Sequence, residues 1–222
     1  MRLIISKLCV LSLLSVLLQP ASLEAARLKP HNHTDGYIAR LLVNEAPFPG
    51  ERGWVSEADT KATMLAILWV LHGRIHHVPD GYTQKQLAAT NSKNIIDVIT
   101  VGGEKGQCDG FYRDSKGTPK AVSRVHERVN YLENIAGKGK PGKFARLLDY
   151  AQGLASAYTS GGMKEADRFA SLQNVGSIQV TGRAYSWMTD KDIYNPGGTF
   201  VKIPDSKSGS LGGNRFFTLK KK

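Results

Sequence analysis

The feature that most constrains the fold is a run of helical periodicity over residues 37–77. Apolar residues in 37–45 recur at the i, i+3, i+4 spacing, which predicts a helix with one buried face. Two prolines and a glycine within 47–50 end that helix. Ser56, with an acidic residue three positions later, is a variant of the capping box and begins a long helix. Its apolar residues cover most of its surface, so we expect this helix to form the centre of the core.

The rest of the chain predicts more helices and then a small sheet. Residues 27–35 are expected to be a flexible leader and 205–213 a flexible loop. Apolar residues of 177–181, 199–203 and 215–219 alternate or are β-prone. The expected fold class is therefore α+β, mainly helical, with a small C-terminal antiparallel sheet. Further helices are expected at 83–90, 92–98, 121–136 and 144–158.

Residues 1–26 have the layout of a secretory signal peptide. Arg2 and Lys7 form a positive end, residues 8–18 an apolar core, and small residues near Ala26 a cleavage region. The apolar core is shorter than the roughly 20 residues that span a bilayer as a helix. No later segment approaches that length, so no transmembrane segment is expected after processing. Residues 27–222 show no internal repeat and are expected to form a single domain.

The chain is strongly basic, with a formal net charge of +11. Residues 1–26 hold two of the 30 basic and one of the 19 acidic residues, which leaves +10 on residues 27–222. Such a charge favours an anionic partner: a cell-wall polymer, a membrane surface or nucleic acid. Export makes nucleic acid the least natural of these, and none is expected. Most of the basic residues are also compatible with an ordinary solvated surface.

Glu45 is the first candidate for catalysis. It sits where the first helix ends, next to Leu42, Ala46, Phe48 and other apolar residues. A carboxyl group that is partly desolvated there has a raised pKa, as a general acid near neutral pH requires. The alternative is a solvated carboxylate at a helix end.

Cys108 suggests a different chemistry. It is the one cysteine of residues 27–222, so no disulfide can form within them. Its Gly-Gln-Cys setting is similar to amidases and peptidases with a cysteine nucleophile. Those enzymes need a histidine base, and His126 is the one histidine that follows. The alternative is a buried structural cysteine.

Three histidines near the end of the long helix invite a metal-binding interpretation. His72 and His76 are one helical turn apart, and His77 follows directly. No HExxH pattern or nearby carboxylate pair accompanies them. We therefore expect polar residues at a helix end, with no metal site and no cofactor.

Three segments together resemble the SleB-type cell-wall hydrolase family. Residues 38–46, followed by an alanine-rich helix, are similar to its catalytic-glutamate segment. Residues 94–111 are similar to its downstream segment, and 212–217 to its closing strand. The chain departs from the family where Pro47–Pro49 precede Glu51, so either a loop is inserted or Glu51 shares the site. Other departures are Cys108 in place of an aromatic residue and Arg215 in place of a histidine.

The resemblance implies a lysozyme-like, mainly helical domain that acts on peptidoglycan glycan strands. It implies cleavage of the β-1,4 bond between N-acetylmuramic acid and N-acetylglucosamine, with a lytic transglycosylase as the expected type. Glu45 would act as general acid and then base, and Glu51 is a possible second carboxylate. The expected location is exported, periplasmic or extracellular, in association with the cell wall and its anionic polymers.

Substrate-binding residues are expected among amide and aromatic side chains. Gln107 is a candidate for hydrogen bonds to an N-acetyl group or hydroxyl, or for capping the backbone of its loop. Tyr112, Trp54 and Trp187 are candidates for stacking on sugar rings, or for packing inside the protein. Two other classes of function stay open: a basic wall-binding or envelope protein without catalysis, and a thiol-dependent amidase that uses Cys108.

Overall fold

The computed structural model describes residues 27–138, 142–163, 165–189 and 196–222, so the predicted signal peptide lies outside the described residues. The helices are α1 (Thr34–Glu45), α2 (Glu57–His76), α3 (Gln84–Ala88), α4 (Ile95–Thr100), α5 (Ser123–Ala136) and α6 (Lys143–Thr159), with short 3-10 turns at Gly103–Lys105 and Asp205–Lys207. The strands are β1 (Phe111–Arg113), β2 (Pro119–Ala121), β3 (Leu172–Val175), β4 (Ile178–Gly182), β5 (Ser186–Thr189), β6 (Phe200–Lys202), β7 (Ser210–Leu211) and β8 (Asn214–Leu219).

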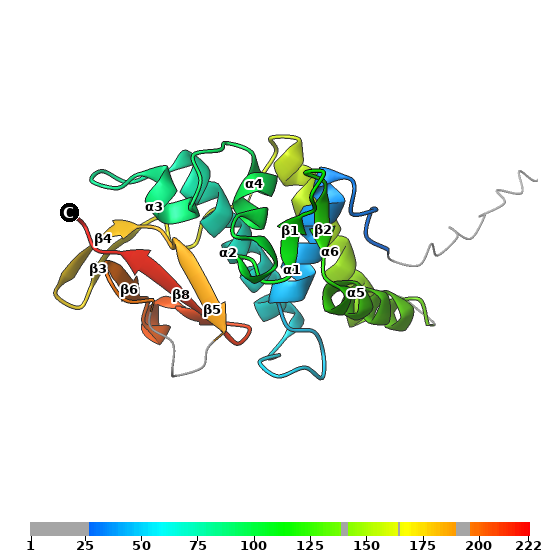
Figure 1. The fold of residues 1–222 in the computed structure, drawn as a ribbon. Coiled ribbons are helices and arrows are strands. Elements are labelled where there is room, and N and C mark those ends of the chain that lie inside the picture. Colours follow the sequence, from blue (N-terminus) through cyan, green and yellow to red (C-terminus); the bar gives the residue numbers. More distant parts are fainter. Residues whose placement is uncertain (1–26, 139–141, 164, 190–195) are drawn as a thin grey trace, which may run out of the picture.

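Helices and strands occupy different parts of the molecule. Most of the helices gather on one side, and the strands that follow α6 form the other side, with α3 lying over the sheet (Figure 1). β8 is the central strand of an antiparallel sheet, with β5 and β6 as its neighbours and β7 paired to its start. This arrangement confirms the predicted combination of a mainly helical chain and a small antiparallel sheet near the C-terminus.

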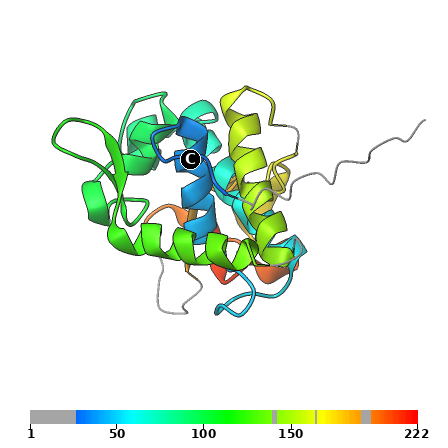
Figure 2. The same cartoon turned by 90° about the vertical axis from the view of Figure 1, so that its right-hand side faces the viewer.

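The core is built around α1 and α2. α1 packs against α6, α5 and α2, and in Figure 2 α5 crosses below the neighbouring α1 and α6. Ile38, Leu41 and Leu42 of α1 are fully buried, as their spacing predicts. α2 buries side chains on most of its surface, which also agrees with its sequence. None of the described helices is both long and apolar enough to cross a membrane.

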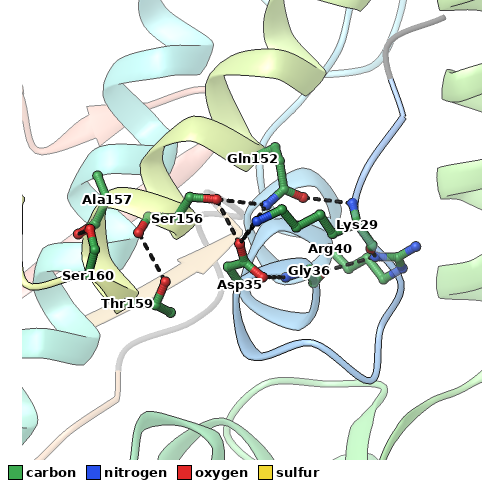
Figure 3. A network of polar contacts seen from close by, with 9 residues as sticks. All are labelled: Lys29, Asp35, Gly36, Arg40, Gln152, Ser156, Ala157, Thr159 and Ser160. Atoms are coloured by element: carbon green, nitrogen blue, oxygen red, sulfur yellow. Dashed lines mark hydrogen bonds and ion pairs between the residues drawn. The ribbon is translucent and has the colours of Figure 1, made fainter. Parts of the chain in front are cut away.

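The segment before α1 is not the flexible leader expected from the sequence. Leu28 is only 6% exposed. Asp35, in the first turn of α1, accepts hydrogen bonds from Lys29 Nζ (2.6 Å) and from Ser156 Oγ on α6 (2.7 Å) (Figure 3). The prediction was wrong because Ser156 lies 121 residues away from Asp35, and no local sequence pattern predicts such a contact.

The start of α2 is tied to the turn before β8. Ser56 Oγ accepts the N–H of Asp59 at 3.0 Å and caps the helix, as predicted. The Asp59 carboxylate accepts the N–H of Gly212 at 2.8 Å. Gly53 and Gly213 pack so closely that a Cβ on Gly53 would lie 2.9 Å from the Gly213 Cα. The 212–213 turn is thereby held against the loop that follows α1.

Candidate active site

Glu45 lies at the end of α1, where that helix meets the sheet. Its Oε2 accepts a hydrogen bond from Trp187 Nε1 on β5 at 3.0 Å. Its Oε1 accepts one from Asn44 Nδ2 at 3.2 Å. Its main-chain carbonyl accepts one from Asn214 Nδ2 on β8 at 2.7 Å. The carboxyl group is therefore held by its neighbour Asn44 and by Trp187, 142 residues away, while Asn214 binds the main chain of Glu45.

The strand register explains why two of these partners come from the sheet. Trp187 is paired with Phe216, and Thr189 with Asn214. Since side chains alternate between the two faces of a sheet, Trp187 and Asn214 lie on the same face. This face is turned toward the end of α1. The 212–217 segment singled out in the sequence is thus in contact with Glu45.

Burial raises the pKa of the Glu45 carboxyl above its ordinary value. The hydrogen bonds from Trp187 and Asn44 act in the opposite direction, because they stabilise the carboxylate. The negative charge of Asp109 adds to the rise. A carboxyl group with these neighbours can hold a proton at a higher pH than a solvated glutamate, and its anion still has two hydrogen-bond donors.

Arg74 of α2 connects Gln107 with the Trp187 indole. The Arg74 side chain is buried, and its guanidinium lies 5.4 Å from the centroid of the Trp187 ring. Nε donates to the carbonyl of Tyr185 at 2.8 Å, and Nη1 donates to Gln107 Oε1 at 2.6 Å. Burial lowers the pKa of Arg74 to about 10, so it stays a cation at neutral pH. Gln107 itself is exposed, and its amide nitrogen faces no described partner.

Cys108 is buried beside this group and is not activated. Its residue exposure is 1%, and burial raises the pKa of the thiol to about 12, with a further rise from Glu45 and an opposing effect of Arg74. A thiol with this pKa is almost entirely protonated at neutral pH, whereas the thiolate is the nucleophile. The ring of His126, the one candidate base, lies 5.5 Å from the ring of His31. Cys108 therefore fits a structural role.

Glu51 is bound by an arginine of α5. Its Oε1 accepts from Arg128 Nε at 3.0 Å, and its Oε2 accepts from the main-chain N–H of Phe48 at 2.7 Å. Arg128 also donates to the carbonyls of Val43 and Ala46, at the end of α1. Pro47–Pro49 therefore belong to a loop that Glu51 and Arg128 hold closed.

The aromatic residues divide into two groups. Trp187 contacts Glu45, whereas Trp54 lies under Lys143, whose Nζ is 5.2 Å from the ring centroid. The ring of Tyr112 is on the opposite face of β1 from buried Phe111. Within the described part of the chain, neither Trp54 nor Tyr112 has a hydrogen bond or ring contact with Glu45.

Arg215 lies on the opposite face of β8 from Asn214. Its Nη1 forms an ion pair with Asp205, and it also donates to the carbonyl of Ile203 at 3.3 Å. The departure from the family pattern at this position therefore faces away from Glu45.

The three histidines of the α2 end are close together: the rings of His72 and His76 are 4.5 Å apart, and those of His72 and His77 are 5.2 Å apart. Among the described residues, no group of three or more His, Cys, Asp or Glu side chains is arranged to hold a metal ion.

Arg74 is the main participant that sequence reasoning did not single out. It occupies a buried position of α2, three residues after buried Leu71. A charged residue at a core position of a helix is unusual, and this could have marked Arg74 as a functional candidate in the sequence.

Compared with models of protein families, with curated proteins and with solved structures, the chain has no match.

Proposed function

We propose that this chain is an exported peptidoglycan glycosidase that acts as a lytic transglycosylase, with Glu45 as its general acid and base. The observation that carries the proposal is the Glu45 carboxyl, desolvated at the end of α1 and held by Trp187 at 3.0 Å. The sequence resemblance supplies the substrate: the β-1,4 bond between N-acetylmuramic acid and N-acetylglucosamine.

In the first step, the protonated Glu45 carboxyl donates its proton to the glycosidic oxygen, and the bond from that oxygen to the anomeric carbon of the muramoyl residue breaks. The raised pKa supports this step, because the acid form must be populated at the working pH. As the carboxylate forms, Trp187 Nε1 and Asn44 Nδ2 stabilise it.

In the second step, the Glu45 carboxylate accepts the proton of the muramoyl 6-hydroxyl. The 6-oxygen bonds to the anomeric carbon and closes an anhydro ring, and Glu45 regains its proton. Because the sugar hydroxyl replaces water, no second carboxylate is needed. This agrees with the position of Glu51, whose carboxylate is bound to Arg128.

Gln107 is the proposed binding residue for an N-acetyl group. Its Oε1 is bound by Arg74, so its exposed Nε2 is left to donate to a sugar carbonyl or hydroxyl. The Trp187 indole is held by Glu45 at its nitrogen and by Arg74 at its face. This arrangement suits a residue that positions the Glu45 carboxyl better than one that stacks on a sugar ring. The formal charge of +10 on residues 27–222 favours anionic wall polymers as a further partner.

Digestion of purified sacculi tests the reaction type. The proposal predicts disaccharide-peptide products that end in an anhydromuramoyl residue, lighter by one water than hydrolysis products. Hydrolysis products would contradict the transglycosylase chemistry. Products cut at the amide bond, lost in Cys108→Ser, would instead favour the amidase. Wall binding without any product would favour the non-catalytic wall-binding protein.

A further inference from the structure

A cavity of about 590 Å³ lies away from Glu45, between α1, α2, α4 and α6. Its lining includes Thr34 at the start of α1, about 16 Å along that helix from Glu45. It also includes His72, and two residues along an α-helix point to nearly opposite sides, so Arg74 faces away from it. The cavity and the Glu45 group are therefore separate places in the molecule. Its volume is in the range of small-molecule sites, about 300–1,000 Å³.

Aromatic rings form one wall of this cavity. The His72 ring lies edge-on to Trp69, at 5.2 Å between centroids, and edge-on to Tyr158, at 5.8 Å. His76 is exposed and lies 4.5 Å from His72. Trp69 is fixed by its Nε1, which donates to the carbonyl of Glu165 at 3.1 Å. The wall is thus built by rings that hold one another in place.

The imidazole at the centre of this wall is neutral. Burial, followed by the charges of His76, His77 and Arg183, lowers the pKa of His72 to about 4. Its Nδ1 is buried and has no hydrogen-bond partner among the described residues. An unpaired N–H there would be costlier than an unpaired acceptor, so the proton belongs on Nε2.

Polar groups complete the lining. Thr34, Tyr158 and Thr159 bring hydroxyl groups, and Asn94 brings an amide. Lys93 is the cation of the lining, and its Nζ donates to the carbonyl of Ile75 at 2.8 Å. None of the residues that line this cavity is acidic. A cationic ligand would find no carboxylate, and a purely apolar ligand would leave these polar groups without partners.

We propose that this cavity is a second carbohydrate site, which binds a short anionic glycan. The C–H face of a sugar ring packs on the aromatic wall, while its hydroxyl groups meet the threonines and Asn94, and its carboxylate meets Lys93. The assignment of this sugar as a segment of wall glycan rests on the proposed function. The cavity would then hold the strand at a second point while Glu45 acts on another.

Calorimetric titration tests the site with a tetrasaccharide of alternating N-acetylglucosamine and N-acetylmuramic acid. The protein carries Glu45→Gln, so that no cleavage occurs, and a chelator excludes metal binding by the histidines. Thr159 is exposed at the edge of the cavity, and Thr159→Trp fills its mouth without touching the core. The number of tetrasaccharides bound per protein should fall by one. In the protein without Thr159→Trp, His76→Ala should weaken binding at the cavity about tenfold.

The matched control is Thr118→Trp, the same change at an exposed position of the β1–β2 turn. It should leave the stoichiometry unchanged. Equal stoichiometry with and without Thr159→Trp would overturn the second site, as would an equal loss in the control. The proposed function fails separately, if Glu45→Gln keeps full lytic activity. The neutral N-acetylglucosamine tetramer should bind more weakly at the cavity, and equal affinity would overturn the role of Lys93.

Discussion

At the residue scale, Glu45 experiences two opposing influences. Burial favours its neutral form, while Trp187 and Asn44 donate hydrogen bonds that favour its anion. A general acid that must become a base needs both forms to be accessible. The structure thus places desolvation and donors on one carboxyl group, which suits proton transfer in both directions.

Glu45→Gln should make the fold more stable at neutral pH. The folded-state pKa of Glu45 is raised, so its favourable contribution is present below the ordinary glutamate pKa and is lost as pH rises through the folded value. Glutamine never ionises. The gain should be about 1 kcal/mol at about pH 8, the usual scale of a stabilising substitution at such a site. The difference in stability should vanish at about pH 4, the ordinary range of a glutamate pKa.

Urea denaturation of both proteins at the two pH values measures this difference. A glutamine variant that is less stable at about pH 8, or a difference that does not change with pH, would contradict the assignment of a raised pKa.

Arg74→Lys should reduce catalysis while the protein still folds. Lysine keeps the charge but lacks the planar fork that reaches Tyr185 and Gln107 together. Small displacements of a positioned group can cost about 10²-fold in rate. We expect kcat to fall by that order with a smaller change in KM, measured on soluble glycan. An unchanged kcat in a folded Arg74→Lys protein would show that Arg74 is only structural.

At the scale of elements, the sequence predicts those with a clear period. Each of the six expected helices overlaps one of α1 to α6, although α4 begins at Ile95 and not at 92, and the strands β4, β6 and β8 lie close to their predicted positions. Apolar spacing predicts these elements because it shows which face is buried. β1, β2, β3 and β5 were not predicted, and neither was the two-residue β7, which pairs with β8 inside the expected flexible loop 205–213. These strands have at most four residues each, too few to show alternation, and their pairing with another strand defines them.

The candidate site also has a part that the sequence predicts and a part that it does not. Glu45 was predicted as a candidate from its place at a helix end. Its contact with 212–217 depends on the strand register, which only the structure shows. The positions of Trp54 and Tyr112 could not be predicted, since an aromatic residue carries no signal of which partner it meets. Glu45 and Trp187 are 142 residues apart, and only the folded chain brings them together.

Arg128→Ala should loosen the connection from α1 to α2. It removes donors from the carbonyls of Val43 and Ala46 and leaves Glu51 without its cation. A buried polar group without its partner costs about 1–3 kcal/mol. Thermal denaturation should show a loss of stability in that range. Lys61→Ala, which removes an ion pair within α2, is the control and should change little. Equal stability of the Arg128→Ala variant and the parent protein would contradict the role of Arg128 in holding this loop.

At the scale of the whole molecule, charge should govern the attachment to the wall. The formal charge of residues 27–222 is +10, after the two basic and one acidic residues of 1–26 are removed. Screening shortens from about 8 Å at 0.15 M salt to about 3 Å at 1 M. Binding of the Glu45→Gln protein to sacculi should therefore weaken severalfold over this range. Cosedimentation measures it, and equal binding at both salt concentrations would show that sugar contacts dominate.

The central claim is that Glu45 performs the chemistry, and the rate of sacculus digestion by matched glutamine variants tests it most directly. Glu45→Gln should lower the rate by about 10²–10⁴-fold, the usual contribution of general acid–base catalysis, while folding and wall binding persist. Glu51→Gln should cost much less, because that carboxylate holds Arg128. Full activity of Glu45→Gln, or greater loss in a folded Glu51→Gln protein, would contradict the account.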